Sequence, residues 1–182
     1  MVKKKTSVKK TTTLLAFLFA MVVSGFFAKE AVIKEYAPPV KGIISGTVTK
    51  ISDGDTLTII NSENKLVKVR LYGIDSPETK QEFGSNAKDF LSNQINGKYI
   101  TIDVIDIDRY KRSVGRIFLD DLDINRAMVE NGYAWVYSQY CKIPECVEWE
   151  RLQETAKINK TGLWQDDNPT PPWKWRKDSS YK

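Results

Sequence analysis

The stretch Lys65-Leu66-Val67-Lys68-Val69-Arg70-Leu71-Tyr72 alternates apolar and polar side chains in steps of two. Such alternation is typical of a β-strand that buries one face and exposes the other. The polar residues 61–64 precede it, and the apolar run 57–60 comes before them. These segments together predict a β-hairpin whose loop lies at 61–64.

Further strands and then helices are predicted along the chain, because runs of β-branched residues give way to apolar repeats at helical spacing. The predicted strands are 44–51, 57–60, 65–72, 99–107 and 114–119, and the predicted helices are 83–95, 124–131 and 144–160. Helices after the third and fifth strands indicate an α+β fold, a five-stranded OB-type β-barrel with about three helices.

The N-terminal segment, residues 1–28, has five lysines among its first ten residues and ends in an apolar run of 15 residues, 14–28. That run is shorter than the ~20 residues needed to span a bilayer and matches a secretory signal peptide. We therefore expect an exported protein. Phe26 stands where a cleavage site prefers a small residue, which leaves a short retained anchor as the alternative.

The remainder divides into three parts by composition. We expect a linker over 29–41, one domain over 42–167, and an irregular tail over 168–182 that contains proline and tryptophan. Trp173 and Trp175 are the residues that could pin this tail to the domain.

The whole chain carries 28 basic and 23 acidic residues, a net charge of +5. Residues 1–28 contain five of the lysines and no acidic residue, so the remainder has 23 of each and is neutral. Affinity for nucleic acid therefore needs a local basic patch rather than bulk charge. The stretches 109–116 and 174–177 are the two candidates.

The chain has two cysteines and no histidine. A histidine base is therefore excluded, and two thiolates cannot complete a structural zinc site. Any proton transfer falls to a carboxylate, a lysine, a tyrosine or water. In an exported protein Cys141 and Cys146 most simply form a disulfide that closes a small loop, with two free thiols as the alternative.

Several acidic residues lie in or near predicted turns. Asp53-Gly54-Asp55 taken alone is most simply a turn, and the residues after it do not match the glycine and glutamate of an EF-hand. Asp103, Asp106 and Asp108 also lack that pattern, and we interpret them as the solvated face of a strand.

A second acidic turn, Asp75-Ser76-Pro77-Glu78, follows the strand that carries Arg70. Pro77 fixes the backbone, so Asp75 and Glu78 project in defined directions. Arg70 is costly to bury without an acidic partner and, taken alone, would simply be an ion pair. Carboxylate oxygens bind Ca²⁺ or Mg²⁺, and guanidinium groups bind phosphate through paired hydrogen bonds. These residues, with Arg112, suit a hard cation beside a phosphodiester.

Four stretches together, Asp53–Thr56, Arg70–Thr79, Asp108–Arg112 and Ile124–Val136, give the chain a resemblance to the staphylococcal nuclease (thermonuclease) family. Their order and spacing agree with that family over about residues 46–164. The resemblance implies Ca²⁺ as the cofactor and DNA and RNA as substrates. It also implies attack at phosphorus that leaves 3′-phosphate ends.

The resemblance implies a role for each matching residue. It assigns Ca²⁺ binding to Asp55, Asp75 and the Ser76 carbonyl, activation of water to Glu78, phosphate binding to Arg70 and Arg112, and substrate contacts to Tyr110, Tyr140 and the neighbouring Arg109. The chain departs from the family pattern at three positions. Ser76 replaces a common threonine, Lys111 replaces a common glycine, and Ser138 replaces a tyrosine whose place Tyr137 could take.

We therefore expect an exported, calcium-dependent nuclease that acts as a monomer without a protein partner and meets a membrane only if residues 1–28 are retained. The alternative from another class is a non-catalytic nucleic-acid-binding OB module. Such a module would usually lack the set of Arg70, Glu78 and Arg112, which is complete here.

Overall fold

The computed structural model describes residues 34–179. The signal peptide or anchor predicted at 1–28 lies outside the described residues, as does the start of the linker. Within 34–179, no helix is both long enough and apolar enough to cross a membrane.

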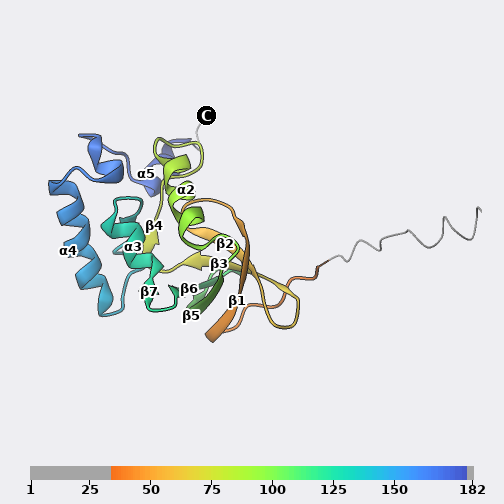
Figure 1. Ribbon diagram of the computed structural model, residues 1–182. Helices are drawn as coiled ribbons and strands as arrows, with labels where there is room; N and C mark the ends of the chain where they lie inside the picture. The colour runs from red at the N-terminus through yellow and green to blue at the C-terminus, as the bar shows by residue number, and fades with distance from the viewer. Residues whose placement is uncertain (1–33, 180–182) are drawn as a thin grey trace, which may run out of the picture. The chain divides into compact units, whose positions relative to one another are not determined.

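Five strands form a closed β-barrel, as Figure 1 shows: β1 (Gly42–Ile51), β2 (Thr56–Ile60), β3 (Leu66–Leu71), β5 (Tyr99–Ile107) and β6 (Ser113–Leu119). The strands pair antiparallel in the order β3-β2-β1-β5-β6, and a parallel pairing of β3 with β6 closes the barrel. Closure leaves no long unpaired edge. The predicted α+β, OB-type fold is confirmed.

The barrel core follows the alternation seen in the sequence. On β3, Val67, Val69 and Leu71 are buried, whereas Lys68 is exposed. The inward positions of the other strands are filled mainly by isoleucine, whose branched side chain packs well on a pleated surface. Arg70 does not fit this pattern, because it faces away from the apolar core and is still only 17 % exposed.

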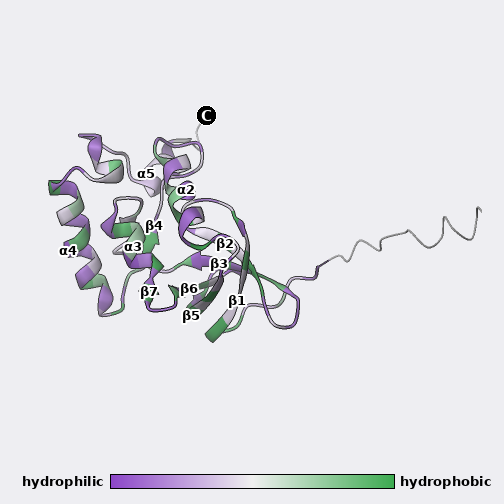
Figure 2. Ribbon diagram, viewed as in Figure 1, coloured by the Kyte–Doolittle hydropathy of each residue, from purple (hydrophilic) through white to green (hydrophobic). Residues whose placement is uncertain are grey.

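The described part of the chain has four α-helices and one 3₁₀ helix: α2 (Gly84–Ile95), α3 (Ile124–Glu130), α4 (Glu145–Ile158), η1 (Gly162–Gln165) and α5 (Pro172–Ser179). α3 packs against β6, α2 and α4, so it lies between the barrel and α4 (Figure 1). Hydrophilic and hydrophobic residues alternate along α4 (Figure 2), as expected of a helix with one face on the protein.

Three strands of two residues were not predicted: β4 (Ile74–Asp75), β7 (Leu122–Asp123) and β8 (Trp135–Val136). They are too short to show a period in the sequence. β7 extends the edge of β6, and β4 pairs with β8 in a separate two-stranded sheet. The second pairing matters for the site, because it places Asp75 directly opposite Trp135.

The predicted linker and the tail predicted to be irregular both contain regular structure. In the linker, the Ala37 N–H donates to the Leu66 carbonyl at 2.9 Å, so this part of the linker pairs beside β3. The tail is not irregular, because residues 172–179 form α5. Pro172 suits the first turn of a helix, and Trp173 packs on Trp135 and Tyr137.

Candidate active site

One cleft of about 710 Å³ opens beside the ends of the barrel strands. The predicted catalytic residues Arg70, Glu78 and Arg112 all line it, as do Asp55 and Ser76. The turn before β2, strand β3, the segment after β4 and the connection from β5 to β6 supply these side chains. The fold therefore collects in one place residues that are scattered along the sequence.

The two aspartates of the Asp53–Asp55 turn have different roles. The Asp53 carboxylate accepts a hydrogen bond from the Asp55 N–H at 3.0 Å, which is the turn contact expected from the sequence. Burial raises the pKa of Asp53, although the charge of Arg70 opposes that shift. Asp55 is 3 % exposed, and its Oδ2 accepts from the Ser76 N–H at 2.9 Å. The turn thereby ties Asp55 to the segment that follows β4.

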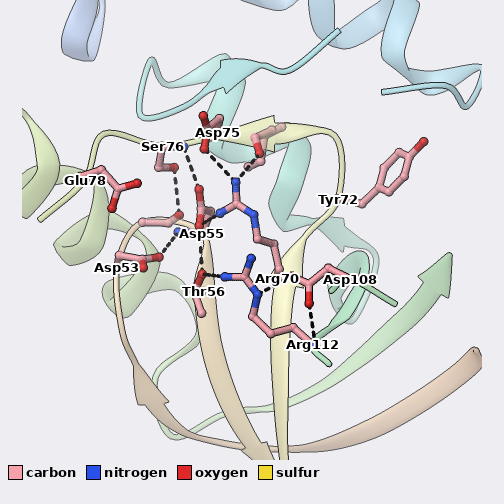
Figure 3. Close-up of polar contacts among 12 residues, drawn as sticks. Asp53, Asp55, Thr56, Arg70, Tyr72, Asp75, Ser76, Glu78, Asp108 and Arg112 are labelled. Atoms are coloured by element: carbon pink, nitrogen blue, oxygen red, sulfur yellow. Dashed lines mark hydrogen bonds and ion pairs between the residues drawn. The ribbon is translucent and has the colours of Figure 1, made fainter. Parts of the chain in front are cut away.

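Arg70 lies between two carboxylates (Figure 3). Its Nη1 donates to Asp55 Oδ1, and its Nη2 donates to Asp75 Oδ1 at 2.8 Å. Asp75 is fully buried and needs such a partner, because an isolated buried charge is costly. Burial lowers the pKa of Arg70, and the charge of Asp75 opposes that shift. One guanidinium group therefore bridges the two predicted calcium ligands.

Arg112 is held by Asp108 and Thr56 (Figure 3). Its Nε donates to Asp108 Oδ2 at 2.6 Å, and its Nη1 donates to Thr56 Oγ1 at 3.3 Å. The interpretation of Asp108 as a solvated strand residue is wrong, because β5 ends at Ile107 and Asp108 begins a tight turn. Asp106 is exposed, as expected.

Glu78 completes the set, and Figure 3 shows its side chain pointing toward Asp55 and Arg70. Its backbone N–H donates to Gln81 Oε1 at 3.2 Å, which fixes the chain just before α2. Its side chain is 33 % exposed and so is accessible to water from the cleft.

The acidic side chains beside the cleft are possible ligands for a metal ion. Within residues 34–179, no three histidine, cysteine or acidic side chains gather closely enough to hold a metal by themselves. Asp55 and Asp75 nevertheless both contact the same guanidinium, so one cationic group can reach both carboxylates. Two carboxylates and a nearby main-chain carbonyl are hard oxygen donors, which fit a hard divalent cation such as Ca²⁺.

Comparison with protein families agrees with this geometry. The model of the family described as "Staphylococcal nuclease homologue" matches residues 68–166, which is more than half of the chain. The chain belongs to the staphylococcal nuclease family. The resemblance seen in the sequence is confirmed.

Similar proteins of this staphylococcal nuclease family occur in bacteria and plants. An "Uncharacterized endonuclease" of Escherichia coli O157:H7 is 40% identical over 134 residues, which cover 73% of this chain and 85% of that protein. An "Uncharacterized endonuclease" of Haemophilus influenzae is 42% identical over 130 residues, 71% of each chain. The "Probable staphylococcal-like nuclease CAN3" of Oryza sativa subsp. japonica is 41% identical over 111 residues, 61% of this chain and 29% of the rice protein.

This member of the staphylococcal nuclease family presents aromatic side chains at the rim of its cleft. Tyr110 and Tyr140 are 63% and 57% exposed. Arg109 Nη2 donates to the Tyr110 hydroxyl at 2.7 Å, and the Arg112 guanidinium lies 5.5 Å from the Tyr110 ring centre. Tyr140 packs edge-on against Tyr137. Exposed rings beside arginines are suited to stacking with bases.

The departures from the family pattern have visible consequences. Lys111 has φ 59°, a left-handed conformation that favours glycine, the residue expected here from the resemblance. Ser138 donates to Glu150 of α4 at 3.0 Å and so is turned toward that helix. Tyr137, the proposed substitute, lines the cleft but stacks on Trp173. Burial and the charge of Asp75 raise the pKa of Tyr137.

The disulfide between Cys141 and Cys146 is present in the structure, with the two Cα atoms 5.8 Å apart. Both cysteines are buried. The Cys141 N–H donates to the Tyr137 carbonyl at 2.9 Å, so the bridged loop is continuous with the tyrosine segment at the rim of the cleft.

One residue of the cleft was not predicted from the sequence. Arg176 of α5 contacts both Asp75 and Glu78. The basic stretch 174–177 and its two tryptophans were the available signals. They indicated a basic patch and a tail packed on the domain, but not the surface of the domain on which the tail packs.

Proposed function

We propose that this protein is a calcium-dependent nuclease that hydrolyses phosphodiester bonds of DNA and RNA with little sequence specificity and leaves 3′-phosphate ends. The proposal rests on the arrangement in which Arg70, Arg112 and Glu78 share one cleft with the buried Asp55, while the fully buried Asp75 accepts a hydrogen bond from Arg70. Family membership and the relatives named as endonucleases support hydrolysis of nucleic acid.

The two arginines bind the scissile phosphate. Arg70 and Arg112 present planar guanidinium groups to its non-bridging oxygens, where negative charge increases in the transition state. Because Asp55, Asp75 and Asp108 hold these groups before substrate arrives, little reorganisation is needed. Loss of one such donor typically costs about 3–4 kcal/mol of transition-state stabilisation.

Glu78 acts as the general base. Its carboxylate takes a proton from water as the water oxygen attacks phosphorus, and the bond from phosphorus to the 5′ oxygen breaks. The phosphate then remains on the 3′ side, and the 5′ oxygen leaves as a hydroxyl after it takes a proton from solvent water. The exposed side of Glu78 gives water a route to this position.

Asp55, Asp75 and the Ser76 carbonyl are the groups that would hold Ca²⁺. A bound Ca²⁺ supplies positive charge beside the phosphate and makes nearby water more acidic. Asp55 and Asp75 are fixed for this task by Ser76 N–H and by Arg70.

Both DNA and RNA are expected substrates, because the proposed contacts address phosphate and the faces of bases, which the two polymers share. Single strands should be preferred, since Tyr110 and Tyr140 offer stacking surfaces to unpaired bases. Export and a monomeric state belong to the same proposal, and the disulfide between Cys141 and Cys146 supports export.

The alternative is a non-catalytic nucleic-acid-binding OB module. A fluorogenic assay on single-stranded DNA and RNA, with Ca²⁺, Mg²⁺ or excess chelator, separates the two. We expect cleavage with Ca²⁺, little with Mg²⁺ and none with chelator, and Glu78→Gln should be nearly inactive. Binding without cleavage under every cation would favour the module, and full turnover in chelator would rule out the cation-dependent mechanism.

The ends of the products test the direction of cleavage. Fragments that carry a 5′ hydroxyl accept a label from a polynucleotide kinase without prior phosphatase treatment. Products that need the phosphatase would show that the 3′ oxygen leaves instead.

A further inference from the structure

Arg176 brings the C-terminal helix into contact with the proposed catalytic carboxylates. Its Nη1 donates to Glu78 Oε1 at 2.8 Å and to Asp75 Oδ1 at 3.1 Å, and its Nη2 donates to Asp75 Oδ2 at 2.8 Å. One guanidinium group therefore joins the proposed base to a proposed cation ligand. Burial lowers the pKa of Arg176, but the hydrogen bonds that it donates to Asp75 and Glu78 outweigh this effect, so the pKa is raised.

Aromatic packing fixes α5 over the site. Trp173 stacks on Tyr137 with ring centres 4.9 Å apart and planes 10° apart, and it meets Trp135 edge-on at 5.7 Å. Trp135 pairs directly with Asp75 in the β4–β8 sheet. The surface on which α5 packs and the carboxylate that Arg176 contacts therefore belong to one pair of strands.

A second link ties the segment before α5 to the backbone of Glu78. The Glu78 N–H donates to Gln81 Oε1 at 3.2 Å, and Gln81 Nε2 donates to the Thr170 carbonyl at 2.6 Å. The Gln81 amide thus bridges Glu78 and the tail. Both the main chain and the side chain of Glu78 are held by the C-terminal segment.

We propose that α5 is part of the active site and that Arg176 is a positioning residue, which fixes the Glu78 carboxylate relative to Asp75. This inference rests on the proposed function. A planar fork can engage two carboxylates at once, whereas an ammonium group cannot reproduce that geometry. A small misplacement of a catalytic group can lower the rate by orders of magnitude.

The contact has an electrostatic consequence for the cation. Arg176 places positive charge against both oxygens of Asp75, so it opposes binding of a metal cation there. Removal of Arg176 should strengthen cation binding while it weakens catalysis. A residue that served only to stabilise the fold would not produce this pair of opposite effects.

The test compares the full-length protein with Arg176→Gln and with Lys174→Gln, which removes the same charge from an exposed position of the same helix. Calorimetric titration with Ca²⁺ alone should show affinity at least threefold higher for Arg176→Gln. At saturating Ca²⁺ its kcat should fall at least ~10-fold with little change in KM. Arg176→Lys should recover part of kcat, and Lys174→Gln should match wild type in both measurements.

Four results would overturn the inference. They are unchanged kcat, a rise in KM with kcat retained, a higher kcat, which would make α5 an inhibitory element, and Ca²⁺ affinity equal to or lower than wild type. Trp173→Ala serves as the second variant, since loosening α5 should lower kcat in the same way, and thermal unfolding checks that each variant folds. An inactive wild type would instead refute the proposed function, and the Ca²⁺ titration would still decide whether Arg176 opposes the cation.

Discussion

Asp108 holds both ends of Arg112. Its Oδ2 accepts from the Arg112 side-chain Nε at 2.6 Å, and its Oδ1 accepts from the Arg112 main-chain N–H at 2.9 Å. The same Oδ1 accepts from the Tyr110 N–H at 2.9 Å. The Asp108 carboxylate thus stabilises the turn and orients the Arg112 guanidinium group. The turn after β5 therefore determines where Arg112 lies.

Asp108→Asn should lower both stability and turnover. Asparagine is neutral and has only one acceptor oxygen, so it cannot replace all of these hydrogen bonds. Hydrogen bonds to charged groups contribute about 1.5–3 kcal/mol to the free energy of unfolding. Turnover should fall because Arg112 loses its support. Unfolding in urea and kcat at saturating substrate measure the two effects. Asp121→Asn, at an exposed position, should change the free energy of unfolding by less than about 0.5 kcal/mol.

The stability effect of Asp108 should depend on pH. Burial alone would raise the pKa of Asp108, but hydrogen bonds from Arg112 and Tyr110 outweigh it and lower the pKa. A lowered pKa in the folded state gives stability that is present above the unfolded value of about 3.9 and is lost as pH falls through the folded value. The gap between wild type and Asp108→Asn should therefore be full at pH 7 and shrink in acid. A gap that grew in acid would contradict this assignment.

The arginines of the cleft should differ sharply from Arg116. Arg70→Lys should be severely damaging because a point ammonium cannot replace the fork between Asp55 and Asp75, and Arg112→Ala should lower turnover at least ~10². Arg116 donates instead to Glu145 at 2.7 Å and to Asp123 at 2.9 Å.

Arg116→Ala should therefore lower the melting temperature but leave the kcat of folded protein within a few-fold of wild type. Thermal unfolding and steady-state kinetics on the same samples separate the two effects. If Arg116→Ala were as inactive as Arg112→Ala, the choice of Arg112 as the second phosphate ligand would be wrong.

Gly54→Ala should disturb the site through lack of space. A Cβ at this position would lie 2.7 Å from the Cβ atoms of both Ser76 and Ala87, so the acidic turn and the segment after β4 would have to separate. Overpacking of this kind costs about 1–3 kcal/mol, and Ca²⁺ affinity should fall because Asp55 is bonded to Ser76.

Gly97→Ala is the control for this effect. Gly97 has φ 73°, so alanine is strained there, but its Cβ would meet nothing within 4 Å. The stability of the Gly97→Ala variant should fall, while its Ca²⁺ affinity measured by calorimetry stays at the wild-type value. Equal loss of affinity in both variants would show that general destabilisation, not the Gly54 contact, weakens the cation site.

The sequence predicted the parts of the fold that local periodicity determines. The alternation over 65–72 gave β3 to within a residue at each end, and the repeat over 83–95 gave α2. The two-residue strands β4 and β8 have no period to detect. α5 was missed because Trp173 and Trp175 do not lie at helical spacing, and its position depends on packing against Tyr137, far away in the sequence.

The residues of the candidate site also divide into those that local sequence predicts and those that depend on tertiary packing. Arg70, Asp75 and Glu78 lie within nine residues of one another, so strand geometry and Pro77 indicated that they act together. The end of β5 at Ile107 was predicted correctly, but Asp108 was still interpreted as a solvated strand residue, because the sequence does not show that its side chain turns back to Arg112. Arg176 reaches Glu78 across 98 residues, and only the docking of α5 determines that contact.

The bridge between Cys141 and Cys146 closes a very small loop, so its removal should cost only about 2 kcal/mol of stability. The Tyr140 and Cys141 N–H groups both donate to the Tyr137 carbonyl, at 2.7 and 2.9 Å, so the bridge also steadies the tyrosines at the rim. Cys141→Ser with Cys146→Ser should therefore fold and keep calcium-dependent cleavage, but bind single-stranded DNA more weakly.

Urea unfolding measures the stability change, and fluorescence anisotropy with a labelled oligonucleotide measures binding. Tyr140→Ala in the bridged protein is the matched control, because it removes the rim contact directly and should weaken binding by a similar factor. Mass spectrometry of the native protein before and after reduction tests the premise. Two thiols that alkylate freely without reduction would contradict it, and unchanged oligonucleotide affinity in the double variant would show that the bridge does not order the rim.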